Sequence, residues 1–167
     1  RKRFLSPGEA STILQHLDRV PDLIGQILVQ QDHIADVVAK HVQRDNWLFL
    51  GRGVNYPVAM EGALKLKEIS YIHAEGMPAA EMKHGPIALI DKGMPVVVVA
   101  TRSSQYEKVL SNIEEVRSRG GHVIAVATEG DDSIRDICED IFFVPDIPEP
   151  LQPLLTVVPL QLLAYHA

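Results

Sequence analysis

The sequence contains a single cysteine, Cys138, among its 167 residues. One thiol excludes an intramolecular disulfide and a metal cluster built from cysteines. Basic residues are also in the minority, with 16 against 22 acidic ones and a formal net charge of -6. Because proteins that bind nucleic acid usually carry a basic patch, this balance argues against a nucleic-acid partner. A small anionic substrate needs only a few local donors, so the charge does not exclude one.

Long hydrophobic runs are missing as well. No apolar stretch reaches the roughly 18 to 20 residues that a membrane span requires. The start of the chain, Arg1 to Leu5, is too short for the apolar region of a signal peptide. We therefore expect no membrane association and a cytoplasmic location. Hydrophobic residues make up 46% and charged residues 23%, as in an average globular protein, so we expect a folded domain.

Short apolar runs alternate with helical patterns along most of the chain. Strands are expected at residues 47–50, 95–100, 122–127 and 141–144, and helices at 22–42, 55–73, 78–84, 105–118, 133–138 and 151–166. This alternation predicts an α/β fold, a three-layer αβα sandwich around a mainly parallel sheet. Residues 1–18 are expected to be a linker or N-terminal extension with some local helix, and residues 19–167 to be one domain.

Parallel sheets bind ligands beyond the carboxyl ends of their strands, which directs attention to the loops 51–53, 101–105 and 128–131. Gly51-Arg52-Gly53 lacks the third glycine of a dinucleotide motif, since Tyr56 stands in its place, and we expect no dinucleotide. Ser103 and Ser104 offer hydroxyls to a phosphate or, the interpretation that we favour, cap the following helix.

Glu61, Lys65 and Glu68 are four and three residues apart, so they share one face of the helix expected at 55–73. The ordinary interpretation is a solvated stripe of ion pairs. The alternative is catalytic: one carboxylate can carry a proton between two adjacent sugar carbons, as an aldose–ketose isomerisation requires. A neighbouring ammonium would keep the carboxylate ionised and stabilise an enediol-like intermediate. The catalytic interpretation places the pair at the mouth of the sheet, and the spacing alone does not decide.

His84 lies at the end of the short helix expected at 78–84. An imidazole that titrates near neutrality suits the opening of a sugar ring. A histidine that binds the free carbonyl groups of a helix end is the more common situation. We expect a packing or capping role for His73.

Two segments carry a dense pattern: LGRG at 50–53 followed by YPVAMEGALKLKEISYIHAE at 56–75, and EMKHGPIALI at 81–90. A third segment, PLQLLAYH, follows at 159–166. Together they resemble the isomerase part of the glutamine–fructose-6-phosphate transaminase family, the glucosamine-6-phosphate synthases. In that family two sugar-isomerase (SIS) lobes with a flavodoxin-like fold follow a glutamine-hydrolysing domain. The resemblance implies that this chain is the second lobe.

The resemblance also implies residue roles. Glu68 would shuttle the proton between the first two sugar carbons, and Lys65 would assist it. His84 would open the ring of a sugar bound in the neighbouring subunit, which implies a homodimer. The enzyme would make glucosamine 6-phosphate from fructose 6-phosphate and glutamine, and no cofactor and no metal are expected.

Much of that machinery is absent from this sequence. It lacks an amino-terminal cysteine for glutamine hydrolysis, the first lobe with its phosphate-binding loop, and the tail that follows the last helix in the family. We expect the last helix to be truncated. We therefore expect the chain alone to be inactive and to bind fructose 6-phosphate weakly. One alternative is another SIS-type phosphosugar isomerase or deglycase, which a parent glutaminase domain would exclude. The other is a non-catalytic sugar-phosphate-sensing module, which leaves Lys65, Glu68 and His84 unexplained.

Overall fold

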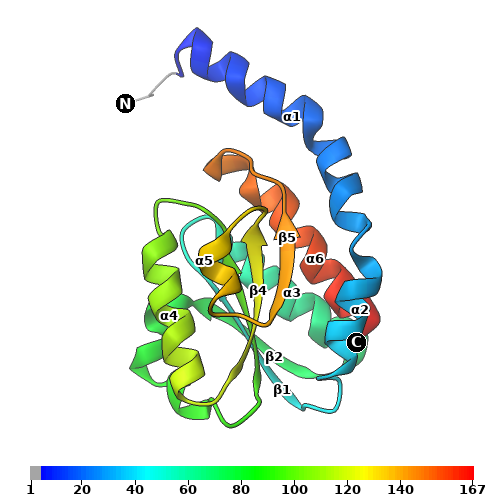
Figure 1. The fold of residues 1–167 in the computed structure, drawn as a ribbon, viewed down its shortest axis with the longest axis vertical. Coiled ribbons are helices and arrows are strands. Elements are labelled where there is room, and N and C mark those ends of the chain that lie inside the picture. Colours follow the sequence, from blue (N-terminus) through cyan, green and yellow to red (C-terminus); the bar gives the residue numbers. More distant parts are fainter. Residues whose placement is uncertain (1–4) are drawn as a thin grey trace.

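Five parallel strands form one sheet in the computed structural model, which describes residues 5–167 (Figure 1). The strands are β1 (Asn46–Gly51), β2 (His73–Pro78), β3 (Pro95–Ala100), β4 (His122–Thr128) and β5 (Asp140–Val144). Their order across the sheet is β2-β1-β3-β4-β5, and every neighbouring pair is parallel. The predicted α/β fold with a parallel sheet is confirmed. The first four residues of the expected linker lie outside the described residues.

Helices cover both faces of this sheet. The α-helices are α1 (Pro7–Leu28), α2 (Gln31–Ala39), α3 (Asn55–Ser70), α4 (Tyr106–Ser118), α5 (Asp132–Arg135) and α6 (Gln152–His166). The 3₁₀ helices are η1 (Ala79–His84), η2 (Pro86–Leu89) and η3 (Glu149–Leu151). Residues of α1, α2, α3 and α6 pack in the core on one face, and residues of α4, α5 and η1 pack on the other. The sandwich therefore has the three predicted layers.

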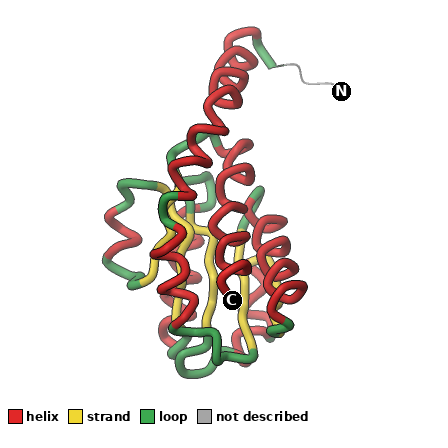
Figure 2. The backbone as a smooth tube through the Cα atoms, turned by 90° about the vertical axis from the view of Figure 1, so that its right-hand side faces the viewer, coloured by secondary structure: helices red, strands yellow, loops and turns green. Residues whose placement is uncertain are grey.

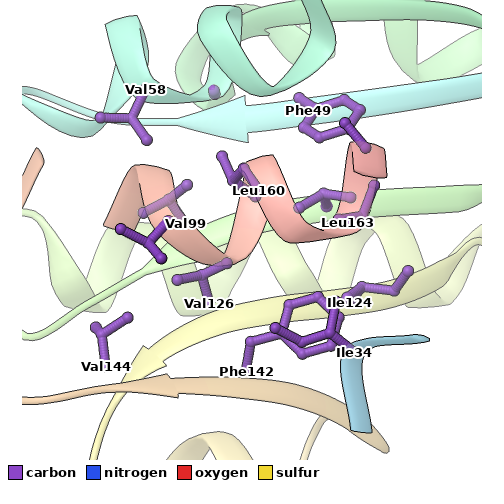
Figure 3. Packing of buried hydrophobic residues seen from close by; sticks show 14 of the residues in the cluster. Ile34, Phe49, Val58, Val99, Ile124, Val126, Phe142, Val144, Leu160 and Leu163 are labelled. Carbon is purple, nitrogen blue, oxygen red and sulfur yellow. The ribbon is translucent and has the colours of Figure 1, made fainter. Parts of the chain in front are cut away.

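Side-chain alternation along the strands divides the core between the two faces. All six residues of β3 are buried, as expected of a central strand covered by helices on both sides. Figure 3 shows Leu160 and Leu163 of α6 beside side chains from three strands, Phe49, Val99 and Val126. All five are at most 2% exposed, so α6 is a central helix of this layer.

The strand β2 was not predicted. Its residues include Gly76 and Pro78, both unfavourable in strand interiors, and they show no clear alternation of apolar and polar side chains. β2 forms because it pairs with β1 over six residues at one edge of the sheet, a tertiary contact that local propensity does not show. The preceding helix ends at Ser70, three residues earlier than predicted, where Tyr71 adopts a left-handed conformation with φ 63°.

Helix α1 replaces most of the expected linker. It begins with a capping box, in which Ser6 Oγ accepts from Glu9 N at 3.2 Å and Ser6 N donates to Glu9 Oε2 at 2.8 Å. The helix continues past residue 18 to Leu28 and contains Pro21 within it. Its first turns project from the layers (Figures 1 and 2), and Leu23 and Ile27 are its buried residues. No end of a helix marks the predicted boundary at residue 18.

Across residues 5–167, no helix combines the length and the hydrophobicity that crossing a membrane would require.

Candidate active site

The predicted charged stripe forms on α3. Lys65 Nζ lies 2.7 Å from Glu68 Oε2 and 3.8 Å from Glu61 Oε1. The hydrogen bond from Lys65 to Glu68, together with the charge of that carboxylate, raises the pKa of the ammonium above its ordinary value. Lys65 is therefore a cation in direct contact with the Glu68 carboxylate.

The stripe faces outward. The buried residues of α3 are Asn55, Val58, Ala59, Gly62, Ala63 and Leu66, which form the opposite side of the helix. The side chains of Glu61, Lys65 and Glu68 are 39%, 34% and 51% exposed. Their carboxylates and ammonium are thus accessible to a molecule or a second domain that approaches the outer surface of α3.

The pair does not lie at the mouth of the sheet, and that expectation was wrong. Helix α3 starts directly after β1, so its first turn lies at the carboxyl end of the strands. It ends just before β2, whose first residue, His73, is in register with Asn46 at the amino end of β1. Glu68 is 13 residues beyond Asn55, about 20 Å along the helix axis. The pair therefore lies toward the amino end of the sheet.

The carboxyl ends of the strands are instead closed by a buried polar network. Asn55 Nδ2 donates to Thr101 Oγ1 at 2.9 Å and to Gln152 Oε1 at 3.2 Å. Thr101 Oγ1 donates to the same Gln152 oxygen at 2.8 Å, and Thr156 Oγ1 donates to Asn55 Oδ1 at 3.2 Å. All four residues are at most 3% exposed. These groups satisfy one another, as buried polar groups must, and so link the start of α3 and the end of β3 to α6.

The hydrogen-bond donors of Ser104, in the loop after β3, are engaged by another residue of the chain, Glu149. Ser104 N donates to Glu149 Oε2, and Ser104 Oγ donates to Glu149 Oε1, both at 3.0 Å. The predicted capping role is wrong, because Gln105 is the N-cap of α4 and makes no side-chain capping bond. Ser103 Oγ instead accepts from Gln105 N at 3.3 Å. Glu149, which sequence reasoning missed, places a carboxylate where a ligand phosphate was considered.

Gly51-Arg52-Gly53 has a structural role at the same edge. A Cβ on Gly51 would collide with the backbone carbonyl of Asn55, so only glycine permits the tight turn from β1 into α3. Arg52 Nε donates to Asn112 Oδ1 of α4 at 3.1 Å. The loop therefore joins β1 to both helix layers, and its arginine already has a partner.

His84 is the exposed last residue of η1. Ala79 and Met82 of η1 pack in the core on the α4 face, and Lys83 Nζ forms an ion pair with Glu115 Oε1 of α4 at 2.6 Å. Helix α3 packs on the opposite face. Within the described chain, no hydrogen bond or ion pair joins His84 to Lys65 or Glu68, so the structure brings together two of the three predicted residues and leaves the third apart.

Two further histidine positions lie away from His84: His73 at the start of β2, and a cluster at the amino ends of β4 and β5. His73 is exposed, and its Nδ1 lies 3.0 Å from Asn46 Oδ1 at the start of the neighbouring strand, so it makes a contact between strands and neither packs in the core nor caps a helix. At the amino ends of β4 and β5, the structure also brings together His41, His122 and Asp140. Sequence reasoning missed this cluster because its members come from three distant segments without a motif spacing.

The comparisons with known proteins agree with this architecture. The chain is 59% identical to the glutamine–fructose-6-phosphate aminotransferase (isomerizing) of Chlorobaculum tepidum over 164 residues, which are 98% of this chain. It is 57% identical to the protein of that name from Thermus thermophilus over 162 residues, or 97% of this chain. The chain spans 27% of the length of each of these relatives.

A solved structure shows the same fold. The C-terminal domain of glucosamine-fructose-6-phosphate aminotransferase from Francisella tularensis matches with a TM-score of 0.90 and 36% identity, over 97% of this chain and 46% of that one. The family described as SIS domain matches residues 42–167. Since that match covers most of the chain and the strands of its sheet, the chain belongs to the SIS domain family.

Proposed function

We propose that this chain is the second SIS lobe of a glutamine–fructose-6-phosphate aminotransferase and supplies Glu68, Lys65 and His84 to its sugar-isomerisation sites. The observation that carries the proposal is the 2.7 Å contact between Lys65 and Glu68 on the outer surface of α3. It occurs in a chain that matches relatives of that name over nearly all of its own length. These names favour the aminotransferase over a deglycase or a sensing module.

The position of the pair supports a site shared with another part of the enzyme. Leu64 and Ile69, which neighbour Lys65 and Glu68 along α3, are 42% and 51% exposed. Large apolar side chains beside a charged pair are typical of a surface that a second domain covers. Covering this surface would take the pair out of water, where the interaction of an ammonium with a developing negative charge is strongest.

The chemistry that we assign to the pair is the one that the family resemblance implies. The Glu68 carboxylate accepts a proton from one sugar carbon and returns it to the neighbouring one, so a single base serves both steps. Lys65 holds that carboxylate in place and carries the positive charge that stabilises the enediol-like intermediate. Proton transfer requires contact with the substrate, and the exposed oxygens of Glu68 allow such contact.

The carboxyl edge of this lobe is an unsuitable place for the sugar phosphate. The backbone N–H and the hydroxyl of Ser104 are both engaged by Glu149. A second anion there would meet a carboxylate of like charge. We therefore assign the phosphate contacts to the other lobe, and we propose that this chain alone has no synthase activity.

His84 suits a role in a neighbouring subunit. It lies on an element that packs against the sheet face opposite to α3. An exposed histidine so placed can contribute to a site that another copy of the chain builds with its own Glu68. We accordingly propose a homodimer and, with it, the cytoplasmic location that the family implies.

The test uses the full-length enzyme with Glu68→Gln. We expect glucosamine 6-phosphate formation to fall by at least about 100-fold, since general-base contributions are typically of that size or larger. Glutamine hydrolysis should persist, because the proposal gives Glu68 a role only in sugar isomerisation. Glu114→Gln, an exposed carboxylate on α4, is the matched control and should be unchanged. Unaltered product formation by Glu68→Gln would refute the assignment.

A further inference from the structure

A second cluster of ionisable side chains lies away from α3, at the amino ends of β4 and β5. Three separate segments contribute to it. His41 follows α2, His122 is the first residue of β4, and Asp140 is the first residue of β5. One ligand atom from each of these residues lies within 4.8 Å of the others. The cluster is separated from Lys65 and Glu68, because β4 and β5 are at the opposite edge of the sheet from β2.

Asp140 is the centre of this cluster. Its Oδ2 accepts from His122 Nε2 at 2.7 Å and lies 3.8 Å from His41 Nε2. Its Oδ1 accepts from Lys40 Nζ at 2.7 Å. The side chain of Asp140 is 5% exposed and that of His41 is 10% exposed, whereas His122 is 25% exposed. Two imidazoles and one carboxylate therefore converge in a largely buried position with one solvent-facing member.

His41 Nε2 has no hydrogen-bond partner, although it is fully buried. An unpartnered buried nitrogen is destabilising relative to one that makes a hydrogen bond. Native proteins keep few such groups, and each calls for a ligand, an ion or a water that would satisfy it. The His41 and His122 rings are 4.3 Å apart between centroids, so an atom between them and Asp140 would contact all three residues.

We propose that His41, His122 and Asp140 form a binding site for one divalent transition-metal ion of the zinc class. Zinc binds imidazole nitrogens and carboxylate oxygens at about 2.0 to 2.2 Å, and three such ligands leave a fourth position for water. Ligand atoms around such an ion are about 3.4 Å apart, so shifts of about 1 Å bring the three residues into place. The single cysteine excludes only a metal cluster built from cysteines, and this site uses none.

An ion would take the place of the proton between His122 Nε2 and Asp140 Oδ2, two atoms that are 2.7 Å apart.

The donor set selects among metals. Magnesium and calcium bind all-oxygen sites with six or more ligands, which this cluster does not provide. Imidazole suits zinc, copper and nickel. His122 also lines a surface pocket of about 300 Å³ with Arg117, Arg135 and Glu139, so this member of the cluster is accessible from solvent. A bound ion would join the end of α2 to the starts of β4 and β5.

Zinc chloride titrated into the 167-residue chain at pH 7.5 tests the site. We expect one ion bound per chain by calorimetry and a rise in melting temperature that a chelator reverses. His41→Gln, His122→Gln and Asp140→Asn should each weaken binding by at least about 100-fold, because each removes a direct ligand, whereas outer-shell changes cost about 10- to 100-fold. Magnesium should neither bind nor compete.

Two further variants complete the test: Lys40→Gln changes a neighbour of the site, and His16→Gln is the control. The Lys40 side chain is 56% exposed, so we expect Lys40→Gln to fold even if a variant of one of the buried ligands does not. Zinc should bind severalfold more tightly to Lys40→Gln, because a cation that competes for Asp140 is lost. His16 lies on α1, and His16→Gln should bind zinc as the unaltered chain does. Absence of one-to-one binding, or binding that survives His122→Gln, would overturn the proposal and leave a buried water as the partner of His41.

Discussion

Ser104 donates two hydrogen bonds to the Glu149 carboxylate, one from its backbone N–H and one from its hydroxyl, and each is 3.0 Å long. They lie 45 residues apart. The contact fastens the loop after β3 to η3, which leads directly into α6. A glutamate of the chain thus occupies the donors that make such loops attractive to anions.

Glu149→Ala should lower the free energy of unfolding by about 1 kcal/mol, because hydrogen bonds to a charged group contribute roughly 1.5 to 3 kcal/mol when buried and less at an exposed loop. Urea unfolding measures the change. Glu149→Gln keeps one acceptor oxygen and should cost about half as much. Combining Glu149→Ala with Ser104→Ala should cost less than the sum of the two single variants; strict additivity would show that the pair does not interact.

Gly76→Ala should destabilise the chain by about 2 kcal/mol, within the range for overpacked cores. A Cβ on Gly76 would lie 2.5 Å from Met60 Cα and 2.9 Å from Ala59 O, so α3 would have to move away from β2. Gly25→Ala in α1 is the matched control, since nothing lies within 4 Å of its added Cβ. It should stabilise the chain by about 0.5 to 1 kcal/mol. Equal effects of the two variants in thermal or urea unfolding would contradict the close approach of α3 to β2.

Strong local patterns were enough to predict most of the fold. The apolar run Pro95–Ala100 is the strand β3 at the bounds expected from it, because a central strand must be apolar at every position. The strand β2 escaped prediction because its pairing with β1, rather than its own residues, makes it a strand. The capping box of α1 was also missed, since Pro7 and Gly8 were interpreted as linker residues.

The candidate site was predicted only where its residues are close in sequence. Lys65 and Glu68 meet because they are three residues apart on one helix. The position of the pair relative to the sheet depends on the direction in which α3 runs, and the spacing of the two residues does not indicate that direction. The contact of Ser104 with Glu149 joins residues 45 apart, and the contact of Lys40 with Asp140 in the His41 cluster joins residues 100 apart, so no local pattern indicates them.

Cys138 should be inert to thiol reagents in the native chain. It is 7% exposed, and burial, only partly offset by Arg117, raises the pKa of its thiol to about 12. Roughly one native molecule in ten thousand is then a thiolate at pH 8, against a far larger fraction of unfolded molecules with the ordinary pKa of about 8.5. A colorimetric disulfide reagent should report one thiol in urea and almost none without it. Rapid native labelling would show that the thiol is accessible.

The same thiol should make stability fall at alkaline pH. Because the native pKa is raised, the stabilisation is fully present below about pH 8.5 and is lost as the pH rises toward 12, where the unfolded state has already released its proton. Between pH 8 and pH 10 the loss should be about 2 kcal/mol. Cys138→Ala removes this contribution. The difference in the free energy of unfolding between the two chains, measured in urea, should therefore shrink from pH 8 to pH 10. A constant difference would contradict the raised pKa.

The isolated chain should bind fructose 6-phosphate weakly. The Ser104 donors of the loop after β3 are engaged by Glu149, and the Lys65–Glu68 pair is exposed to water. We expect no saturable heat in calorimetry up to about 1 mM sugar phosphate, which corresponds to less than about 4 kcal/mol of binding free energy. Inorganic phosphate serves as the control for non-specific anion binding. Tight, saturable binding of the sugar alone would mean that this lobe carries a complete site.

Mixed dimers can show in which subunit His84 acts. Full-length enzyme with Glu68→Gln and full-length enzyme with His84→Ala should each be inactive in isomerisation. If His84 completes the neighbouring subunit's site, a mixed dimer has one site with both an intact Glu68 and an intact His84. Random exchange of subunits should then restore about a quarter of the sites, because half of the dimers are mixed and each has one working site. If both residues served the same subunit's site, mixing would restore nothing.

Two copies of the Glu68→Gln enzyme, exchanged in the same way, are the control. Because η1 and α3 pack on opposite faces of the sheet, we expect the recovery.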